Sequence, residues 1–289
     1  MAWAPPEPKP ENLEILKDFA YVLGWLIKGD GSVFITSGRE KRFIVKFKCK
    51  NRSAVIRANR AFARVLGRCP NRLVRDGHFW VATYHAKAFV IWWKQHSPEG
   101  LKPYIEFSED TIREFIRGYF DSDGSVGNYQ IFLIGAEGHA HVLEYVRKLC
   151  LRLGIRASPI EVYRDAGKEL WIVGKRTIAK ERGLRFSVNA KDFLTIIGGF
   201  SHDVRDRKLR SMVKGRKWTP WSSREREQVL ELISRGLTIR EAARKVGVPY
   251  LTAYFWVKRG TRSWGEYSVI RRVRRRWRAR GDSNPGPTG

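Results

Sequence analysis

Two copies of one short pattern constrain this chain more than any other feature of its sequence. The segment Tyr21–Ser32 reads YVLGWLIKGDGS, an apolar helical stretch that ends in Asp-Gly-Ser. The segment Phe115–Ser125 reads FIRGYFDSDGS and repeats the pattern 93 positions later, measured from glycine to glycine. An apolar helix is ordinarily core, because its side chains leave water on folding. An acidic residue at the tip of such a helix, present twice, indicates that the tips have a function.

The residues of the first copy predict the order helix, two strands, helix, two strands, helix, and those of the second copy predict a comparable layout of three helices and four strands. In the first copy we expect helices at 13–28, 54–66 and 86–96 and strands at 33–36, 42–50, 72–75 and 79–84. Pro98, Glu99 and Gly100 predict a break between the copies. In the second copy we expect helices at 111–120, 139–153 and 190–197 and strands at 129–134, 157–163, 170–173 and 184–188. The predicted fold class is α+β, with an arm at 1–12 and repeats at 13–99 and 100–200.

The strand at 42–50 places apolar and cationic residues on opposite faces. Phe43, Val45, Phe47 and Cys49 alternate with a second row that includes four cations. An ordinary amphipathic strand with a solvated outer face is one interpretation. Four cations without a carboxylate fit a sheet laid against phosphates better. The cations expected to contact nucleic acid from the strands are Arg42, Lys46, Lys48, Arg72, Arg75, Lys175 and Arg185.

The formal net charge of +27 over 289 residues also predicts a polyanionic partner. Nucleic acid is the leading candidate. A membrane is disfavoured, because the chain has no run of about 18 apolar residues and no signal peptide at its start. Three cysteines without a CxxC pair support neither a zinc site nor a disulfide framework. We therefore expect a cytoplasmic, nucleoid-associated protein.

The last third of the chain is a basic appendage that carries +15 of the charge. After a basic linker at 201–217, helices are predicted at 223–235, 239–246 and 250–259, with Thr238 as a cap and a turn at Gly247. The pattern resembles the helix-turn-helix of site-specific recombinases, and a generic three-helix bundle is the alternative. The expected domain is 218–262, followed by an arginine-rich tail at 263–289. The expected contacts to DNA are Tyr250, Thr252, Lys258 and Arg259.

Comparison of the two tips selects two acids from three. Only Asp30 and Asp123 occur in both copies, whereas Asp121 stands opposite Lys28 and is interpreted as a local helix-end or salt-bridge residue. Hydrolysis of a phosphodiester needs an activated water and a counter-charge, which a divalent metal held by carboxylates supplies. For the acids to meet, the helices must cross closely. Small residues in both copies would allow this: Gly24, Gly29, Gly118 and Ser122.

The segments 23–31 and 116–124 resemble the two motifs of single-chain LAGLIDADG homing endonucleases. The resemblance covers roughly residues 13 to 200. It implies a pseudo-twofold monomer of two αββαββα repeats whose sheets lie in the major groove of a long double-stranded DNA target. It also implies that both strands are cut with Mg²⁺, for which Mn²⁺ substitutes.

The same resemblance assigns roles to residues of this chain. Asp30 and Asp123 would bind the metal, together with the carbonyl groups of Gly29 and Ser122. Family sites often carry a lysine at a strand end near the metals, for which Lys50 is the first choice and Lys48 the second. The matching region at 134–138 offers no lysine, so Lys175 would have to reach in from a neighbouring strand. Trp25 also stands where the motif has glycine, which predicts a shifted helix contact in the first copy.

Two other functions remain open at the level of sequence. One is an RNA-binding intron maturase, which the same fold can become. The other is a non-catalytic transcription regulator, since degenerate repeats of this kind joined to a helix-turn-helix act as regulators. The presence of both shared acids favours a site-specific DNA endonuclease.

Overall fold

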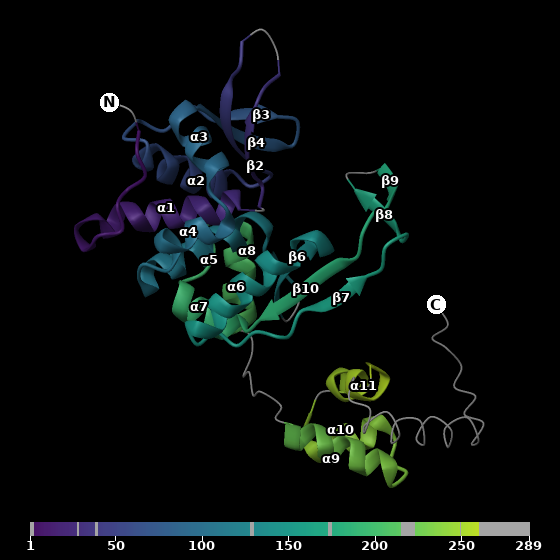
Figure 1. Ribbon diagram of the computed structural model, residues 1–289. Coiled ribbons are helices and arrows are strands. Elements are labelled where there is room, and N and C mark those ends of the chain that lie inside the picture. The colour runs from purple at the N-terminus through teal and green to yellow at the C-terminus, as the bar shows by residue number, and fades with distance from the viewer. Residues whose placement is uncertain are drawn as a thin grey trace. The chain divides into compact units, whose positions relative to one another are not determined.

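A computed structural model describes residues 3–27, 29–37, 40–127, 130–172, 175–214, 223–248 and 250–259. The chain divides into two compact units, Met1–Arg216 and Lys217–Gly289 (Figure 1). Within the described parts of the chain, no helix is long and apolar enough to span a membrane.

The first unit contains two repeats, as the sequence predicts, and β5 (Ser125–Val126) of the second repeat, which the sequence did not predict, makes their order of elements equivalent. A short 3-10 turn, η1 (Pro10–Asn12), precedes the first repeat, and another, η2 (Glu137–His139), lies within the second. The first repeat consists of α1 (Leu13–Leu26), β1 (Gly31–Ile35), β2 (Phe43–Cys49), α2 (Arg52–Val65), β3 (Val74–Asp76), β4 (Phe79–His85) and α3 (Lys87–Gln95). The second repeat consists of α5 (Glu109–Asp123), β5 (Ser125–Val126), β6 (Ile131–Ala136), α6 (Ala140–Arg152), β7 (Glu161–Arg164), β10 (Gly183–Val188) and α7 (Ala190–Ile197).

Each repeat forms one four-stranded antiparallel sheet, and the two sheets have equivalent strand orders. The orders are β1-β2-β4-β3 and β5-β6-β10-β7, so the last strand of each repeat lies between the second and the third. A two-stranded hairpin of β8 (Glu169–Ile172) and β9 (Lys175–Ile178) is inserted between β7 and β10. The α+β fold class and the two repeats are therefore confirmed, whereas β9 is an element that the sequence did not predict.

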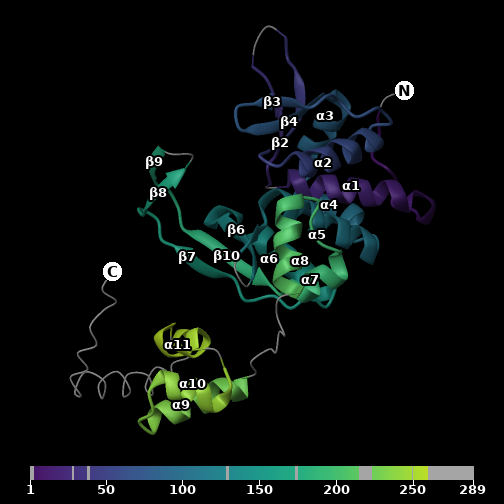
Figure 2. The same ribbon diagram turned by 180° about the vertical axis from the view of Figure 1, so that it is seen from behind.

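The two motif helices, α1 and α5, lie against each other in the first unit (Figures 1 and 2). A Cβ on Gly24 would lie 2.7 Å from the backbone nitrogen of Tyr119, and one on Gly118 would lie 2.9 Å from the carbonyl carbon of Tyr21. Distances this short leave no room for a side chain. The predicted close crossing is confirmed, and Gly24 takes part in it although it is shifted by one position from the place of Gly118.

The side chains around the crossing form one core. Phe19, Trp25, Phe115 and Phe120 are completely buried, as are the inward residues Val45 and Phe47 of β2. The outward residues Lys46 and Lys48 of that strand are only partly buried. The predicted alternation of an apolar and a cationic face on β2 is therefore confirmed.

Two segments differ from the prediction. The expected break at Pro98 is the start of a helix, α4 (Pro98–Ile105). Proline is favoured at the first helical position, where its missing N–H costs nothing, and the Ser97 side chain accepts a hydrogen bond from the backbone of Gly100. The expected linker contains a further helix, α8 (Asp203–Lys214), whose Leu209 is completely buried in the core of the first unit.

The described residues of the second unit form three helices, α9 (Ser223–Ser234), α10 (Ile239–Val246) and α11 (Tyr250–Arg259). They enclose a small core that includes Val229, Ala242 and Ala253. Thr238 caps α10 in a reciprocal arrangement with Glu241, as the sequence predicts. Gly247 ends that helix with a φ of 75°, in the left-handed region that glycine tolerates. The arginine-rich run at 271–280 and the tail lie outside the described residues.

Candidate functional site

The structure brings Asp30 and Asp123 together at the ends of the two crossing helices. Asp123 is the last residue of α5, and Asp30 lies between α1 and β1. The residues before them also meet, because a Cβ on Gly29 would lie 2.8 Å from the Cβ of Ser122. The four residues predicted to bind a metal therefore come from the same end of the crossing.

The two carboxyl groups act on each other electrostatically. Burial, followed by the negative charge of Asp30, raises the pKa of Asp123 from 3.8 to about 7. Burial of its carboxyl group also raises the pKa of Asp30, although part of the residue remains exposed. The Cys49 thiol donates a hydrogen bond to Asp30 and opposes that rise. Two carboxylates that share a site hold a proton or bind a cation, because both cannot be charged without cost.

A residue that the sequence did not single out, Arg205 of α8, lies beside both acids. The positive charge of its guanidinium lowers the pKa of Asp30 and that of Asp123. The Nη1 of Arg205 donates to the carbonyl oxygens at the end of α5, at 3.1 Å from Phe120, 2.7 Å from Asp121 and 3.5 Å from Ser122. A cation is favoured at this position, because a helix C-terminus carries unpaired carbonyls and the negative end of the helix dipole.

Asp121 binds the residues that precede α8 and so helps to position Arg205 beside the paired acids. Its side chain is completely buried and accepts hydrogen bonds from the Tyr21 hydroxyl at 2.7 Å and from the backbone N–H groups of Ser201 at 2.8 Å and His202 at 3.3 Å. Burial raises the pKa of Asp121 to about 6, and these donors oppose the rise. Asp121 is thus a helix-end residue, as interpreted from the sequence, and it fixes the residues that lead into α8.

Residues of the first repeat contact the N-terminal end of α8, at Asp203. Asp203 accepts a hydrogen bond from the Asn51 side chain, and Ser53 donates to it at 3.2 Å and accepts from its backbone at 3.1 Å. Asn51 and Ser53 belong to the start of α2 in the first repeat, whereas Asp121 belongs to the second. The start of α8 therefore connects both repeats beside the paired acids.

The backbone N–H of Lys48 donates to the carbonyl of Asp30 at 3.3 Å, but the side chains of Lys48 and Lys50 interact elsewhere. Lys50 is exposed, and its ammonium lies 5.8 Å from the ring centre of Phe79. Lys48 forms an ion pair with Asp76 at 2.7 Å and lies 4.7 Å from the same ring. Among the described residues, Arg205 is the cation whose charge acts on the pKa of both acids.

Sequence reasoning missed Arg205 because the many cations at 201–217 indicated a linker. A signal was present in that segment. Asp203 and Asp206 lie in the first turn of a helix, where acids are favoured, and Leu209 supplies a buried apolar position. The unmatched Asp121 was a second signal, since a buried acid at a helix end requires partners.

The cations predicted to contact DNA do not all share one surface. Lys46 pairs across the sheet with Thr83 and Lys48 with Val81, on the outer face of the first sheet. Arg75 pairs with Trp80, which is also opposite the buried Cys49, so Arg75 belongs to the other face and its guanidinium lies 5.2 Å from the Trp80 ring.

The remaining predicted contacts are placed as follows. Arg42 and Arg72 are exposed next to β2 and β3, respectively. Arg185 lies on β10 and forms an ion pair with Glu161 at 2.8 Å. Tyr250 is 43% exposed at the start of α11. Lys175 begins β9, and Thr252, Lys258 and Arg259 lie on α11, but the side chains of these four residues lie outside the described part of the structure.

The donor groups at the helix crossing fit a hard divalent cation. Two carboxylates and the carbonyl groups at positions 29 and 122 offer only oxygen, and Mg²⁺ is typically held by one or two carboxylates plus water and phosphate oxygens. A cage of three or more His, Cys, Asp or Glu side chains is absent from the described residues. Any bound Mg²⁺ would therefore complete its coordination with water or with substrate.

Comparisons with known proteins agree with the motif in the second repeat. A family model described as a LAGLIDADG-like domain matches residues 110–198. An uncharacterized protein of Methanocaldococcus jannaschii is 24% identical over 160 residues, which are 52% of this chain and 59% of that protein. The chain thus matches less than two thirds of the length of that relative.

Two solved structures resemble this chain in three dimensions, each with a TM-score below 0.5. The homing endonuclease I-DmoI, in complex with DNA and Mn, has a TM-score of 0.46 and 14% identity, covering 63% of this chain and 97% of that chain. Full-length DUF199/WhiA from Thermatoga maritima has a TM-score of 0.43 and 17% identity, covering 90% of this chain and 92% of that chain. The family model thus matches the region of the second repeat, which includes the motif at 116–124.

Proposed function

We propose that this chain is a site-specific DNA endonuclease of the LAGLIDADG class that makes a metal-dependent double-strand cut. The observation that supports this most strongly is the pairing of Asp30 with Asp123 at the end of the helix crossing, where each acid comes from a different repeat. An acid pair shared by two repeats suits a duplex, because the two strands of DNA are themselves related by twofold symmetry.

Within this proposal, Asp30 and Asp123 hold Mg²⁺ together with the carbonyls of Gly29 and Ser122. The bound metal supplies an activated water and a counter-charge for the anionic transition state. Arg205 adds a fixed positive charge beside the acids. It also keeps the end of α5 in place by binding its carbonyl groups. Lys50, at the end of β2, is proposed to contact the scissile phosphate.

The two sheets are proposed to bind the DNA around the cut. Lys46 and Lys48 provide cations on the outer face of the first sheet, and Arg185 provides one on the second. The three helices of the second unit are proposed to act as a helix-turn-helix that lengthens the recognised site, with α11 in the major groove. The monomeric state expected from the sequence is part of the same proposal, because one chain supplies both acids.

One observation favours a second function, that of a non-catalytic DNA-binding regulator. Arg205 donates to the carbonyl of Ser122, one of the proposed metal ligands, at 3.5 Å. A guanidinium near this carbonyl could hold the two repeats together without a metal.

The test is incubation of the full chain with Mg²⁺ and a library of duplex DNA, followed by sequencing of new ends. Ends at one defined sequence support the endonuclease, and intact DNA bound at a defined sequence supports the regulator.

A further inference from the structure

A row of arginines lies on α2. Residues 51–75 contain seven arginines and no lysine, aspartate or glutamate. Three of the arginines, Arg57, Arg60 and Arg64, are spaced at i, i+3 and i+7 on α2, which places them on one face of the helix. Arg68 follows just after the helix ends. The charge of this segment is therefore concentrated in a row rather than dispersed.

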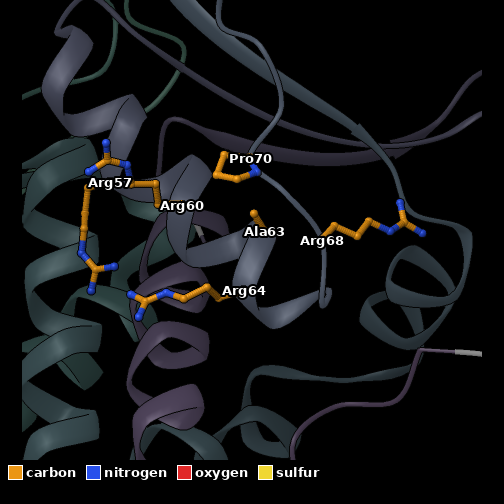
Figure 3. A pocket seen from close by; sticks show the side chains of 6 residues that line it. All are labelled: Arg57, Arg60, Ala63, Arg64, Arg68 and Pro70. Atoms are coloured by element: carbon orange, nitrogen blue, oxygen red, sulfur yellow. The ribbon is translucent and has the colours of Figure 1, made fainter.

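The row borders an open hollow of about 480 Å³, lined by Arg57, Arg60, Ala63, Arg64, Arg68 and Pro70. Every charged residue that lines the hollow is an arginine. Figure 3 shows the guanidinium groups of Arg57 and Arg64 turned toward each other, whereas Arg68 extends to the opposite side.

Two of these arginines are held by one buried acid. Asp18 of α1 is 2% exposed and pairs with Arg57 at 2.7 Å and with Arg64 at 2.7 Å. Arg57 also pairs with Glu114 at 3.3 Å and lies over the ring of Tyr21 at 4.6 Å. A guanidinium held this way still has N–H groups for a ligand and loses little side-chain entropy when it binds.

The acids do not neutralise the row. Glu114 is shared with Arg117 at 2.5 Å, so Asp18 and Glu114 together face Arg57, Arg64 and Arg117. Arg60 is exposed and adds a further positive charge to the rim of the hollow. The surface around the hollow therefore keeps a net positive charge.

This surface lies on the other side of the first sheet from Lys46 and Lys48. Helix α2 packs on the inner face of that sheet, where the rings of Phe62 and Phe47 are 5.4 Å apart. The two lysines project from the outer face. A straight nucleic-acid segment on the outer face cannot also reach α2, because the sheet separates the two surfaces.

We propose that the arginine row of α2 is a second anion-binding surface that holds the phosphodiester backbone of a separate nucleic-acid segment. The row favours an extended polyanion over a small phosphate compound. From Arg57 to Arg64 it runs about 10 Å along the helix, and the hollow beside it is open. The inference goes beyond the proposed endonuclease, since it requires neither metal nor cleavage.

The test compares two doubly substituted variants of the full chain in EDTA. Arg60→Ala with Arg68→Ala removes two cations of the surface and leaves the pairs with Asp18 intact. Lys148→Ala with Lys191→Ala removes the same charge from exposed positions on the second repeat. Binding is measured by fluorescence anisotropy over a range of salt concentrations, with two probes: a duplex DNA of arbitrary sequence and a single-stranded RNA. Thermal melting verifies that both variants are folded.

The slope of log affinity against log salt identifies the ligand. Loss of two phosphate contacts reduces the slope by about 1.8 for duplex DNA and by about 1.4 for a single strand. A reduction of this size in the arginine variant alone supports the proposal, and the probe that shows it identifies duplex DNA or single-stranded RNA. An unchanged slope with both probes, or an equal reduction in the lysine control, overturns it. Cleavage by the arginine variant, measured separately with Mg²⁺, tests the endonuclease independently.

Discussion

The substitution Gly118→Ala tests the helix crossing that brings the two acids together. The added Cβ would lie 2.9 Å from the carbonyl carbon of Tyr21 and closer still to its oxygen. These are backbone atoms of α1, so no side-chain rotation can relieve the overlap. The two helices would have to move apart until carbon contacts approach the usual separation of about 3.5 Å or more.

The expected cost follows from that movement. A gap of about 0.5–1 Å forfeits a quarter to a half of the attraction at each contact, and the core to which both helices belong includes the completely buried Phe19, Trp25, Phe115 and Phe120. Overpacking a core costs about 1–3 kcal/mol, and overlap with backbone corresponds to the upper end. The better helix propensity of alanine returns about 1 kcal/mol. The net loss of unfolding free energy is therefore about 2 kcal/mol, which lowers Tm by about 4–8 °C.

Thermal unfolding followed by circular dichroism in EDTA measures this loss. Gly100→Ala is the matched control, because its Cβ would lie 3.2 Å from the side chain of His96, which can rotate away. We expect the control to change the unfolding free energy by no more than about 1 kcal/mol. If Gly118→Ala melts at the same temperature as the wild-type chain, the close crossing inferred here is refuted.

Three further outcomes are expected. Arg205→Ala should lower the free energy of unfolding in EDTA by about 1–3 kcal/mol, because three carbonyls at the end of α5 lose a charged donor; a melting temperature equal to that of wild type would contradict this role. Because the pKa of Asp123 is raised from 3.8 to about 7, the folded chain holds a proton that the unfolded chain loses. Stability in EDTA should therefore fall as pH rises from about 4 to about 7, and Asp123→Asn should flatten that fall in pH-dependent melting; an unaltered pH profile would argue against the raised pKa. Lys46→Ala with Lys48→Ala should reduce the salt slope of duplex binding by about 1.8, and an unchanged slope would remove the outer face of the first sheet from the interface.

The parts of the fold that sequence could predict are those fixed by local patterns. The two Asp-Gly-Ser tips and their apolar helices predicted the paired repeats, and small residues such as Gly24 and Gly118 predicted the close crossing. The alternation on β2 identified its buried and cationic faces. Each of these features depends on residues close together in the chain, where periodicity and side-chain size are informative.

The parts that sequence could not predict depend on distant partners. The contacts of Arg205 with the end of α5 join residues more than eighty positions apart, and the buried Asp121 directs them. A cation-rich segment resembles a linker when its partners are unknown, so α8 was not recognised. The start of α4 was missed for a different reason, since Pro98 favours a helix start as well as a break.

The measurement that tests the central claim most directly is cleavage of duplex DNA by the full chain with Mg²⁺, compared with Asp30→Asn and Asp123→Asn. Sequencing of the DNA ends reports cutting, and binding to the same DNA is measured in parallel. The paired-acid site predicts a double-strand cut at one sequence by the wild-type chain, which each substitution abolishes while binding stays near normal. Cutting at the wild-type rate by either variant would contradict the assignment of these two acids.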